Sequence, residues 1–436
     1  MLSLKFKAVS TTLGCVVAGL MTAPLLADSS WPTFRGENRT AVSTEKGLLK
    51  SWPEQGPKLL WESKGAGSGY AELAIADGKI FTLGDGPSVA NDDNEYLTCF
   101  SLKDGSPLWH TQTGKPWTSG KPDWQGARGT PSVDGDRVYV VTPHGELYCC
   151  ATADGKVKWK KSFKDDFAGV KADSWGYSES VLVDGDLVIC TPGGPDKTVV
   201  ALDKMTGKTV WTTSRPEDRG AGHSSPVISN VGGTKVYVQV TGSGPMGIRA
   251  SDGKLLWTYD IDKTTCVIPT PIIRNDYVFF AVGYKRGAAL LQQIPGPNQT
   301  VEIKEVYPLQ IKLANKHGGV ILVGDHVYGD SDDAGIPYCA DLMTGEIRWT
   351  KRGPGRGSMS IAGADGQLYL LFADGTMALA KASGEEFVEL GKFQVPGSGD
   401  KPVWAHPVIV DGKLFLRAQD RFFCYDLKGS QQRASK

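Results

Sequence analysis

Eight side chains with acid–base, cationic or aromatic chemistry recur at comparable places along this 436-residue sequence. Two of them are glutamates that close the similar tetrapeptides Gly69-Tyr70-Ala71-Glu72 and Gly176-Tyr177-Ser178-Glu179. The other six, in equivalent or adjacent segments, are Arg128, Trp175, His223, His317, Trp404 and His406. Two carboxylates, three imidazoles, a guanidinium and two indoles in one place would suit a small organic ligand, a Ca²⁺ ion or a quinone.

The same eight residues also have a purely structural interpretation. Polar groups near strand ends commonly hydrogen-bond between neighbouring strands and satisfy buried backbone atoms. No His-x-His or His-x-x-x-His pair is present, so local spacing gives no indication of a zinc site. We therefore expect a candidate ligand site whose metal is unknown, and we assign no catalytic residue.

A repeated strand pattern predicts where these residues lie. Five tryptophans each follow, by four residues, the glycine of an Asp-Gly or Thr-Gly pair: Trp109, Trp159, Trp211, Trp257 and Trp349. Asp-Gly between alternating apolar segments is a strong hairpin signal, because the turn requires positive φ. Each unit contains an apolar run, a glycine turn, an alternating strand, a third strand and a fourth strand with the tryptophan. Glycine, at 54 residues, is abundant enough to supply so many turns.

The repeat predicts an all-β fold, an eight-bladed β-propeller of four-stranded antiparallel blades over residues 58–430. A second series of turns gives the count of eight, and one unit lacks its tryptophan near residues 301–307. The strand Lys58-Leu59-Leu60-Trp61 precedes the first complete unit, whereas the last unit lacks a fourth strand. We expect this N-terminal strand to join the last blade and close the ring, since closure removes an exposed edge. Residues 28–57 would form an N-terminal strap across the surface.

The segments 133–159 and 183–211 carry the pattern in its fullest form, ending in Asp-Gly-Lys or Thr-Gly-Lys and the tryptophan. This pattern resembles the pyrroloquinoline-quinone-like (PQQ-like) repeat of eight-bladed propellers, a superfamily that includes quinoprotein alcohol dehydrogenases and BamB-like outer-membrane assembly proteins. The resemblance covers the chain from the strap onward. It implies the fold, but fold alone does not decide between an enzyme and a binding module.

Cys149 and Cys150 resemble the vicinal disulfide that covers the quinone in quinoprotein dehydrogenases. The repeat favours a different interpretation, because four cysteines occupy the same place in the third strand of their units: Cys99, Cys149, Cys339 and Cys424. A residue type that recurs around a ring is expected to serve packing, where free cysteine behaves as a small buried hydrophobe. No Cys-x-x-Cys-His motif for attaching c-type haem is present.

The N-terminal segment predicts export. Lys5 and Lys7 precede the apolar stretch 8–26, and Ala27 is followed by polar residues. This is the layout of a secretory signal peptide over 1–27, the alternative being an uncleaved membrane anchor. We expect an exported, periplasmic or extracellular chain without a transmembrane span, and a disordered tail over 431–436.

Charge and motifs together favour a binding role. Lys plus Arg and Asp plus Glu both number 48, a balance that argues against nucleic acid as a partner. We expect a monomeric, non-catalytic scaffold for an envelope protein, peptide or glycan, with no cofactor. The alternative implied by the resemblance is a PQQ- and Ca²⁺-dependent oxidoreductase of alcohols or sugars. The quinone would then stack on Trp175 or Trp404, and Glu72 or Glu179 would hold the Ca²⁺.

Overall fold

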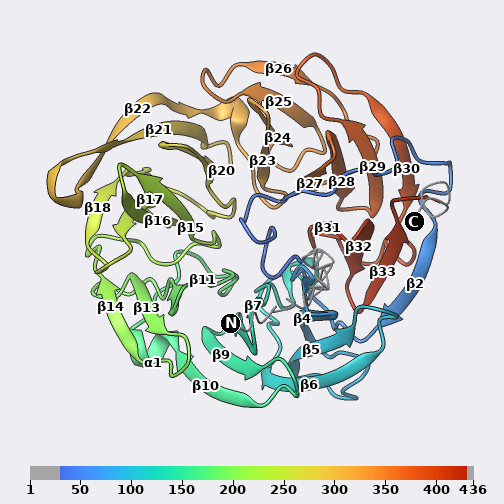
Figure 1. Cartoon of the computed structure of the whole chain (residues 1–436), viewed down its shortest axis with the longest axis horizontal. Helices are drawn as coiled ribbons and strands as arrows, with labels where there is room; N and C mark the ends of the chain where they lie inside the picture. The colour runs from blue at the N-terminus through green and yellow to red at the C-terminus, as the bar shows by residue number, and fades with distance from the viewer. Residues whose placement is uncertain (1–29, 430–436) are drawn as a thin grey trace, which may run out of the picture.

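The computed structural model describes residues 30–429, which form eight β-sheets arranged around a common axis (Figure 1). Seven sheets contain four strands, and the eighth carries a fifth strand at its inner edge. The predicted signal peptide and tail lie outside the described residues. Within residues 30–429, no helix has the length and apolar character needed to cross a membrane. The eight-bladed antiparallel propeller is confirmed.

Blades 1 to 4 follow one another along the chain, each running from an innermost to an outermost strand. Their strands are β3 (Ala74–Ala76), β4 (Lys79–Asp85), β5 (Glu95–Ser101) and β6 (Pro107–Gly114); β7 (Ser132–Asp134), β8 (Arg137–Val141), β9 (Glu146–Ala151) and β10 (Val157–Ser162); β11 (Leu182–Asp184), β12 (Leu187–Cys190), β13 (Val199–Asp203) and β14 (Thr209–Thr213); and β15 (Val227–Val231), β16 (Thr234–Thr241), β17 (Gly244–Arg249) and β18 (Leu255–Thr258).

Blades 5 to 7 repeat this order, and blade 8 takes its outermost strand from the N-terminal region. Their strands are β19 (Ile272–Arg274), β20 (Tyr277–Val282), β21 (Gly287–Pro295) and β22 (Val301–Gln310); β23 (Val320–Val323), β24 (His326–Asp330), β25 (Pro337–Asp341) and β26 (Ile347–Thr350); β27 (Met359–Ala364), β28 (Gln367–Phe372), β29 (Thr376–Lys381) and β30 (Glu389–Gln394), with β1 (Val42–Ser43) beside β27; and β31 (Val408–Val410), β32 (Lys413–Ala418), β33 (Arg421–Asp426) and β2 (Leu59–Lys64). The short helices are η1 (Pro122–Trp124), α1 (Phe163–Phe167), η2 (Pro297–Gln299) and η3 (Ile311–Leu313).

The N-terminal strand β2 closes the ring, as predicted. It pairs antiparallel with β33, and Leu59 lies opposite Tyr425 while Trp61 lies opposite Cys424. Beginning and end of the propeller therefore share one blade, and the outer edge of β33 is covered by hydrogen bonds rather than left open.

The tryptophans and turn glycines interlock neighbouring blades. The indole N–H of Trp109 donates to the Thr152 carbonyl of blade 2 (3.2 Å), and that of Trp159 donates to the Lys204 carbonyl of blade 3 (3.0 Å). The Gly155 turn lies against the Trp109 ring, where an added Cβ would come within 2.5 Å of Cε3. The spacing between glycine and tryptophan thus reflects blade-to-blade packing.

Two blades achieve the same packing without a tryptophan in their fourth strand. In blade 5, Tyr307 occupies the position and donates to the Leu342 carbonyl of blade 6 (3.0 Å). In blade 7 the equivalent residue is Gly391, and Trp52 from the N-terminal segment packs over it. The Trp52 ring contacts Tyr369 at a centroid distance of 5.9 Å, so a residue distant in sequence fills the gap.

The expectation that residues 28–57 would cross the surface is wrong for the first half of this segment. Trp31 pairs with Ile75 in an isolated antiparallel bridge, and Val42 of β1 pairs with Gly363 in the parallel ladder between β1 and β27. The segment therefore passes through the centre of the ring, where Figure 1 shows it in blue. We call residues 30–57 the strap. The inner strands leave a wide axis, and the strap fills part of it with buried side chains.

Two arginines anchor the strap at the centre. Arg35 and Arg39 are 1% and 4% exposed. Arg35 donates to the carbonyl of Val320 in blade 6 (2.5 Å), whereas Arg39 donates to those of Ser180 (2.8 Å) and Val181 beside blade 3. Burial lowers the pKa of both guanidinium groups to about 10, and both stay protonated at neutral pH. One segment thus cross-links blades that lie far apart around the ring.

Candidate functional site

A cavity of about 650 Å³ lies at one end of the ring and is lined by the links that enter the innermost strands. In seven of the eight blades, the residue four positions before the innermost strand borders this cavity. These residues are Tyr70, Arg128, Ser178, His223, Ile268, Lys316 and Trp404. Because the links are equivalent, the repeat itself brings one side chain from nearly every blade to the same place.

Six of the eight predicted site residues line the cavity: Arg128, Trp175, His223, His317, Trp404 and His406. Further aromatic side chains complete its wall, namely Phe34 of the strap, Tyr70, Trp124 and Tyr284. Charge is contributed by Arg128, Lys316 and Asp333. The cavity is therefore largely aromatic, with charged groups of both signs.

Glu72 and Glu179 do not line the cavity, which corrects the expectation that all eight residues meet. The carboxylate of Glu72 accepts hydrogen bonds from the Trp31 indole N–H and the Arg35 backbone N–H (3.2 Å) of the strap. The carboxylate of Glu179 accepts from the Thr191 backbone N–H (2.6 Å) and the Gln239 amide (3.2 Å). Both glutamates therefore support the scaffold.

The two tetrapeptides that seemed equivalent are out of step by one residue. Glu72 lies two residues before its innermost strand, whereas Glu179 lies three before. In an extended chain, successive side chains point to opposite sides, so this offset sends the two carboxylates in different directions. Burial raises the pKa of Glu72 to about 8 and that of Glu179 to about 7.

His317 and Trp404 form a stacked pair in the cavity wall. Their ring centroids are 4.4 Å apart and their planes differ by 7°. Asp333 lies 2.7 Å from the His317 Nδ1 atom and orients the imidazole. Although burial acts to raise the pKa of Asp333, the hydrogen bond from His317 lowers it overall. Tyr70 also contacts Trp404, with centroids 4.6 Å apart.

Arg128 holds two neighbouring loops at the cavity wall. Its guanidinium donates to the Trp175 carbonyl (2.9 Å) and to the Trp124 carbonyl, and it lies over the Tyr70 ring at 5.8 Å. Burial lowers its pKa, but the group remains a cation. Arg128 thus fixes two indole-bearing loops and places positive charge beside them.

His223 is the centre of a buried polar cluster on the cavity wall. Ser178 Oγ lies 2.5 Å from its Nδ1 atom, and Asp173 Oδ2 lies 2.9 Å from its Nε2 atom. Burial, assisted by the charge of Lys171, lowers the pKa of His223 to about 4, so its imidazole is neutral near pH 7. The sulfur of Cys266 lies beside the same pair.

Backbone hydrogen bonds between links hold this cluster in place. The Ala172 N–H donates to the Ala221 carbonyl (3.0 Å), and the Ala221 N–H donates to the Val170 carbonyl (2.8 Å). The His223 N–H donates to the Val267 carbonyl (2.6 Å) and connects the next link. Three consecutive links are therefore tied together at the cavity wall.

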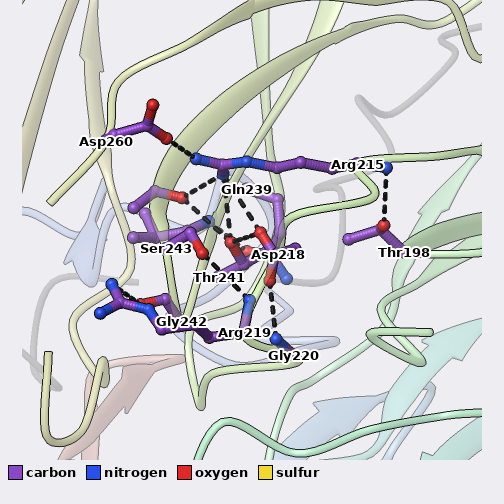
Figure 2. Close-up of polar contacts among 12 residues, drawn as sticks. Thr198, Arg215, Asp218, Arg219, Gly220, Gln239, Thr241, Gly242, Ser243 and Asp260 are labelled. Atoms are coloured by element: carbon purple, nitrogen blue, oxygen red, sulfur yellow. Dashed lines mark hydrogen bonds and ion pairs between the residues drawn. The ribbon is translucent and has the colours of Figure 1, made fainter. Parts of the chain in front are cut away.

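A polar network beneath the His223 link fixes it to blade 4. Arg215 donates to the Gly244 carbonyl (3.0 Å). Figure 2 shows that Arg215 also donates to Asp260 (2.6 Å) and that Asp218 accepts from the Gly220 N–H (2.8 Å). Burial raises the pKa of Asp218 even though Thr241 and Arg215 act to lower it. The link that carries His223 is thus anchored at its start.

The quinone and Ca²⁺ implied by the resemblance do not fit the residues expected to hold them. Glu72 accepts hydrogen bonds from the strap and Glu179 from Thr191 and Gln239, and neither side chain lines the cavity. Cys149 and Cys150 are free thiols inside blade 2, where they pack into clusters on opposite faces of the sheet. His317 already stacks on Trp404, one of the two residues expected to support the quinone.

Sequence reasoning missed several cavity residues, notably Tyr284, Lys316, Asp333 and Cys266. Lys316 and Ile268 were recoverable from the repeat, because they occupy the position four residues before the innermost strand. Cys266 lies in an irregular part of its link, and Asp333 lies in the loop between β24 and β25, so no position of the link repeat marks either residue. Asp173 lies in the Lys171–Trp175 segment and carries no local signal.

These features define the class of protein: a PQQ-like repeat propeller whose channel is partly filled by its own N-terminal segment and opens into a ligand-sized cavity. A family model described as outer membrane protein assembly factor BamB matches residues 93–351. The chain belongs to this family. No curated protein matches the sequence.

Solved structures share the fold at low sequence identity. BamB from Moraxella catarrhalis is 15% identical with a TM-score of 0.59, covering 86% of this chain and 98% of that one. A europium-containing methanol dehydrogenase is 12% identical with a TM-score of 0.62, covering 89% of each chain. Quinohemoprotein alcohol dehydrogenase from Comamonas testosteroni is 14% identical with a TM-score of 0.58, covering 92% of this chain and 81% of that one.

Proposed function

We propose that this protein is an exported binding module that holds an envelope protein by a peptide segment seated in the cavity, without catalysing a reaction. The observation that carries the proposal is the aromatic wall. Four separate links contribute Tyr70, Trp124, Trp175 and Trp404, and the loop between β20 and β21 contributes Tyr284. Tyr, Trp and Arg are the side chains that most often dominate binding energy at protein interfaces.

The size and charge of the cavity support the same conclusion. Its volume of about 650 Å³ falls within the range of sites that accept small molecules or short segments. Arg128, Lys316 and Asp333 offer partners for charged peptide groups at the wall. Membership of a family described as an outer membrane assembly factor is consistent with a protein partner. Export rests on the composition of residues 1–27.

The test uses peptides selected from a displayed library on the purified full chain. Their affinities are then measured by fluorescence anisotropy for the native protein and two variants. Trp175→Ala removes one aromatic side chain from the cavity wall. Leu108→Ala is the control, because Leu108 is 50% exposed on the outer strand β6. We expect Trp175→Ala to weaken binding by at least about tenfold, equivalent to about 1.4 kcal/mol. Leu108→Ala should leave affinity unchanged.

Parallel titrations distinguish the other ligands. Envelope glycan fragments form one arm, and PQQ with Ca²⁺, followed by dye reduction with alcohols or sugars, forms another. Peptides that bind Trp175→Ala as tightly as the native protein would refute the cavity as the docking site. Stoichiometric PQQ binding with alcohol-dependent dye reduction would replace the proposal with the oxidoreductase.

A further inference from the structure

Three potential metal ligands converge beside the cavity. Asp173, His223 and Cys266 each offer one ligand atom, and these atoms all lie within 4.8 Å of one another. The side chains of Asp173 and His223 are both 5% exposed, and Cys266 is 6% exposed. A carboxylate, an imidazole and a thiol in one buried cluster form a mixed oxygen, nitrogen and sulfur set that suits Zn²⁺.

The three ligands come from different links, which are nevertheless rigidly connected. Asp173 precedes blade 3, His223 precedes blade 4 and Cys266 precedes blade 5. The backbone bonds from Ala172 to Ala221 (3.0 Å) and from His223 to Val267 (2.6 Å) join these links directly beside the ligands. The scaffold therefore fixes the relative positions of the three groups, as a pre-organised site requires.

The imidazole of His223 already has the second partner that metal-bound histidines usually possess. Its Nδ1 atom lies 2.5 Å from Ser178 Oγ. If Nδ1–H donates to this hydroxyl, the lone pair of Nε2 is directed toward Asp173, 2.9 Å away, and is available to a metal. Ser178 Oγ can accept this hydrogen bond, so its position is compatible with the tautomer that a metal at Nε2 requires.

We propose that Asp173, His223 and Cys266 bind one Zn²⁺ ion whose fourth coordination position opens into the cavity. With Asp173 and Cys266 ionised and His223 neutral, the ligands contribute two negative charges and balance the ion. His223 and Cys266 both line the cavity, so the remaining position faces it. Three protein ligands with one open position is the arrangement of zinc sites that bind water or an exogenous ligand.

The surroundings indicate which fourth ligand is preferred. Lys171 donates to the Gly222 carbonyl (2.7 Å), next to His223, and its charge acts on Asp173. Because the metal and its ligands are neutral together, this neighbouring cation favours an anion at the open position, such as hydroxide or a carboxylate.

Cobalt substitution gives a direct test. The full chain, purified without a polyhistidine tag and stripped with a chelator, is titrated with Co²⁺ while absorbance is recorded, and Zn²⁺ is then added. We expect one equivalent to bind, with a thiolate-to-cobalt charge-transfer band in the near ultraviolet and intense visible bands of a four-coordinate ion. Zn²⁺ should displace the Co²⁺ and raise the melting temperature, since it binds only the folded chain.

Matched cysteine variants make the test specific. Cys266→Ala should abolish the charge-transfer band and weaken Zn²⁺ binding by at least about tenfold. Cys339→Ala is the control, because Cys339 is a buried thiol whose equivalent in blade 3 is Ala201. Asp173→Asn should retain the charge-transfer band but weaken affinity. Absence of stoichiometric binding, or a charge-transfer band that persists in Cys266→Ala, would overturn the proposal.

Discussion

Closure of the ring can be tested by two glycine substitutions in blade 1. Gly78 and Gly105 have nearly the same backbone conformation, with φ of 70° and 71°. An added Cβ at Gly78 has nothing within 4 Å, whereas at Gly105 it would lie 2.8 Å from the Trp61 ring and 2.7 Å from Ser63 Cβ. Trp61 and Ser63 both belong to β2, the strand that closes blade 8.

The two variants should therefore differ only in packing against the closing strand. Alanine in the left-handed conformation costs about 1–2 kcal/mol at either position. At Gly105, β2 must also shift to relieve overpacking, which adds about 1–3 kcal/mol. Gly78→Ala should lower the free energy of unfolding by about 1–2 kcal/mol, and Gly105→Ala by about 2–5 kcal/mol.

Urea unfolding followed by tryptophan fluorescence measures both variants against the native chain. A lower midpoint with an unchanged slope indicates altered stability rather than an altered transition. Equal losses for Gly105→Ala and Gly78→Ala would show that the contact between blade 1 and β2 contributes nothing, and would contradict the interlocking of blades through their turn glycines.

Three further predictions concern the strap, a buried acid and the adjacent thiols. Arg39→Met should lower the free energy of unfolding by about 2–5 kcal/mol, because it removes a charged donor from the buried carbonyls of Ser180 and Val181; urea midpoints would show this, and a loss below about 1 kcal/mol would contradict the anchoring role. The folded-state pKa of Glu72, about 8, exceeds its ordinary value of 4.5, so the folded chain binds the extra proton and its stability should fall as pH rises between these values. Glu72→Gln should flatten that slope in thermal melts taken across the range, and an unchanged slope would assign it to another group. Burial raises the pKa of Cys149 and Cys150 to about 12, so Ellman's reagent should label neither in the native chain and both in urea; a native mass lower by two hydrogens would instead reveal a disulfide.

The fold was accessible from the sequence because its packing repeats. Trp109 and Trp159 each fit the turn glycine of the next blade, and that contact forces a constant spacing that sequence inspection detects. Blade 7 breaks the pattern, since Gly391 there is covered by Trp52 of the strap. The path of the strap was not predictable, because Arg35 and Arg39 bond to residues 285 and 141 positions away, and no local pattern encodes such contacts.

The candidate site was predictable only where it follows the repeat. Arg128, His223 and Trp404 occupy one equivalent position, and the structure brings them to one cavity. Glu72 and Glu179 share a local motif but differ by one residue in their distance from the strand, and alternation then points them apart. Asp173 and Cys266 meet through backbone bonds between links, which no local spacing encodes.

The pairing of β2 with β33 has a consequence for the order in which the molecule can be completed. β2 is synthesised before the strands β3 to β32 of blades 1 to 8, and its partner β33 is the last strand within residues 30–429. At about 5–20 residues per second, β2 waits roughly 20–70 s for that partner. A chain that stops short of β33 would keep two unpaired strand edges, on β2 and on β32, and such copies are poised to exchange strands with one another.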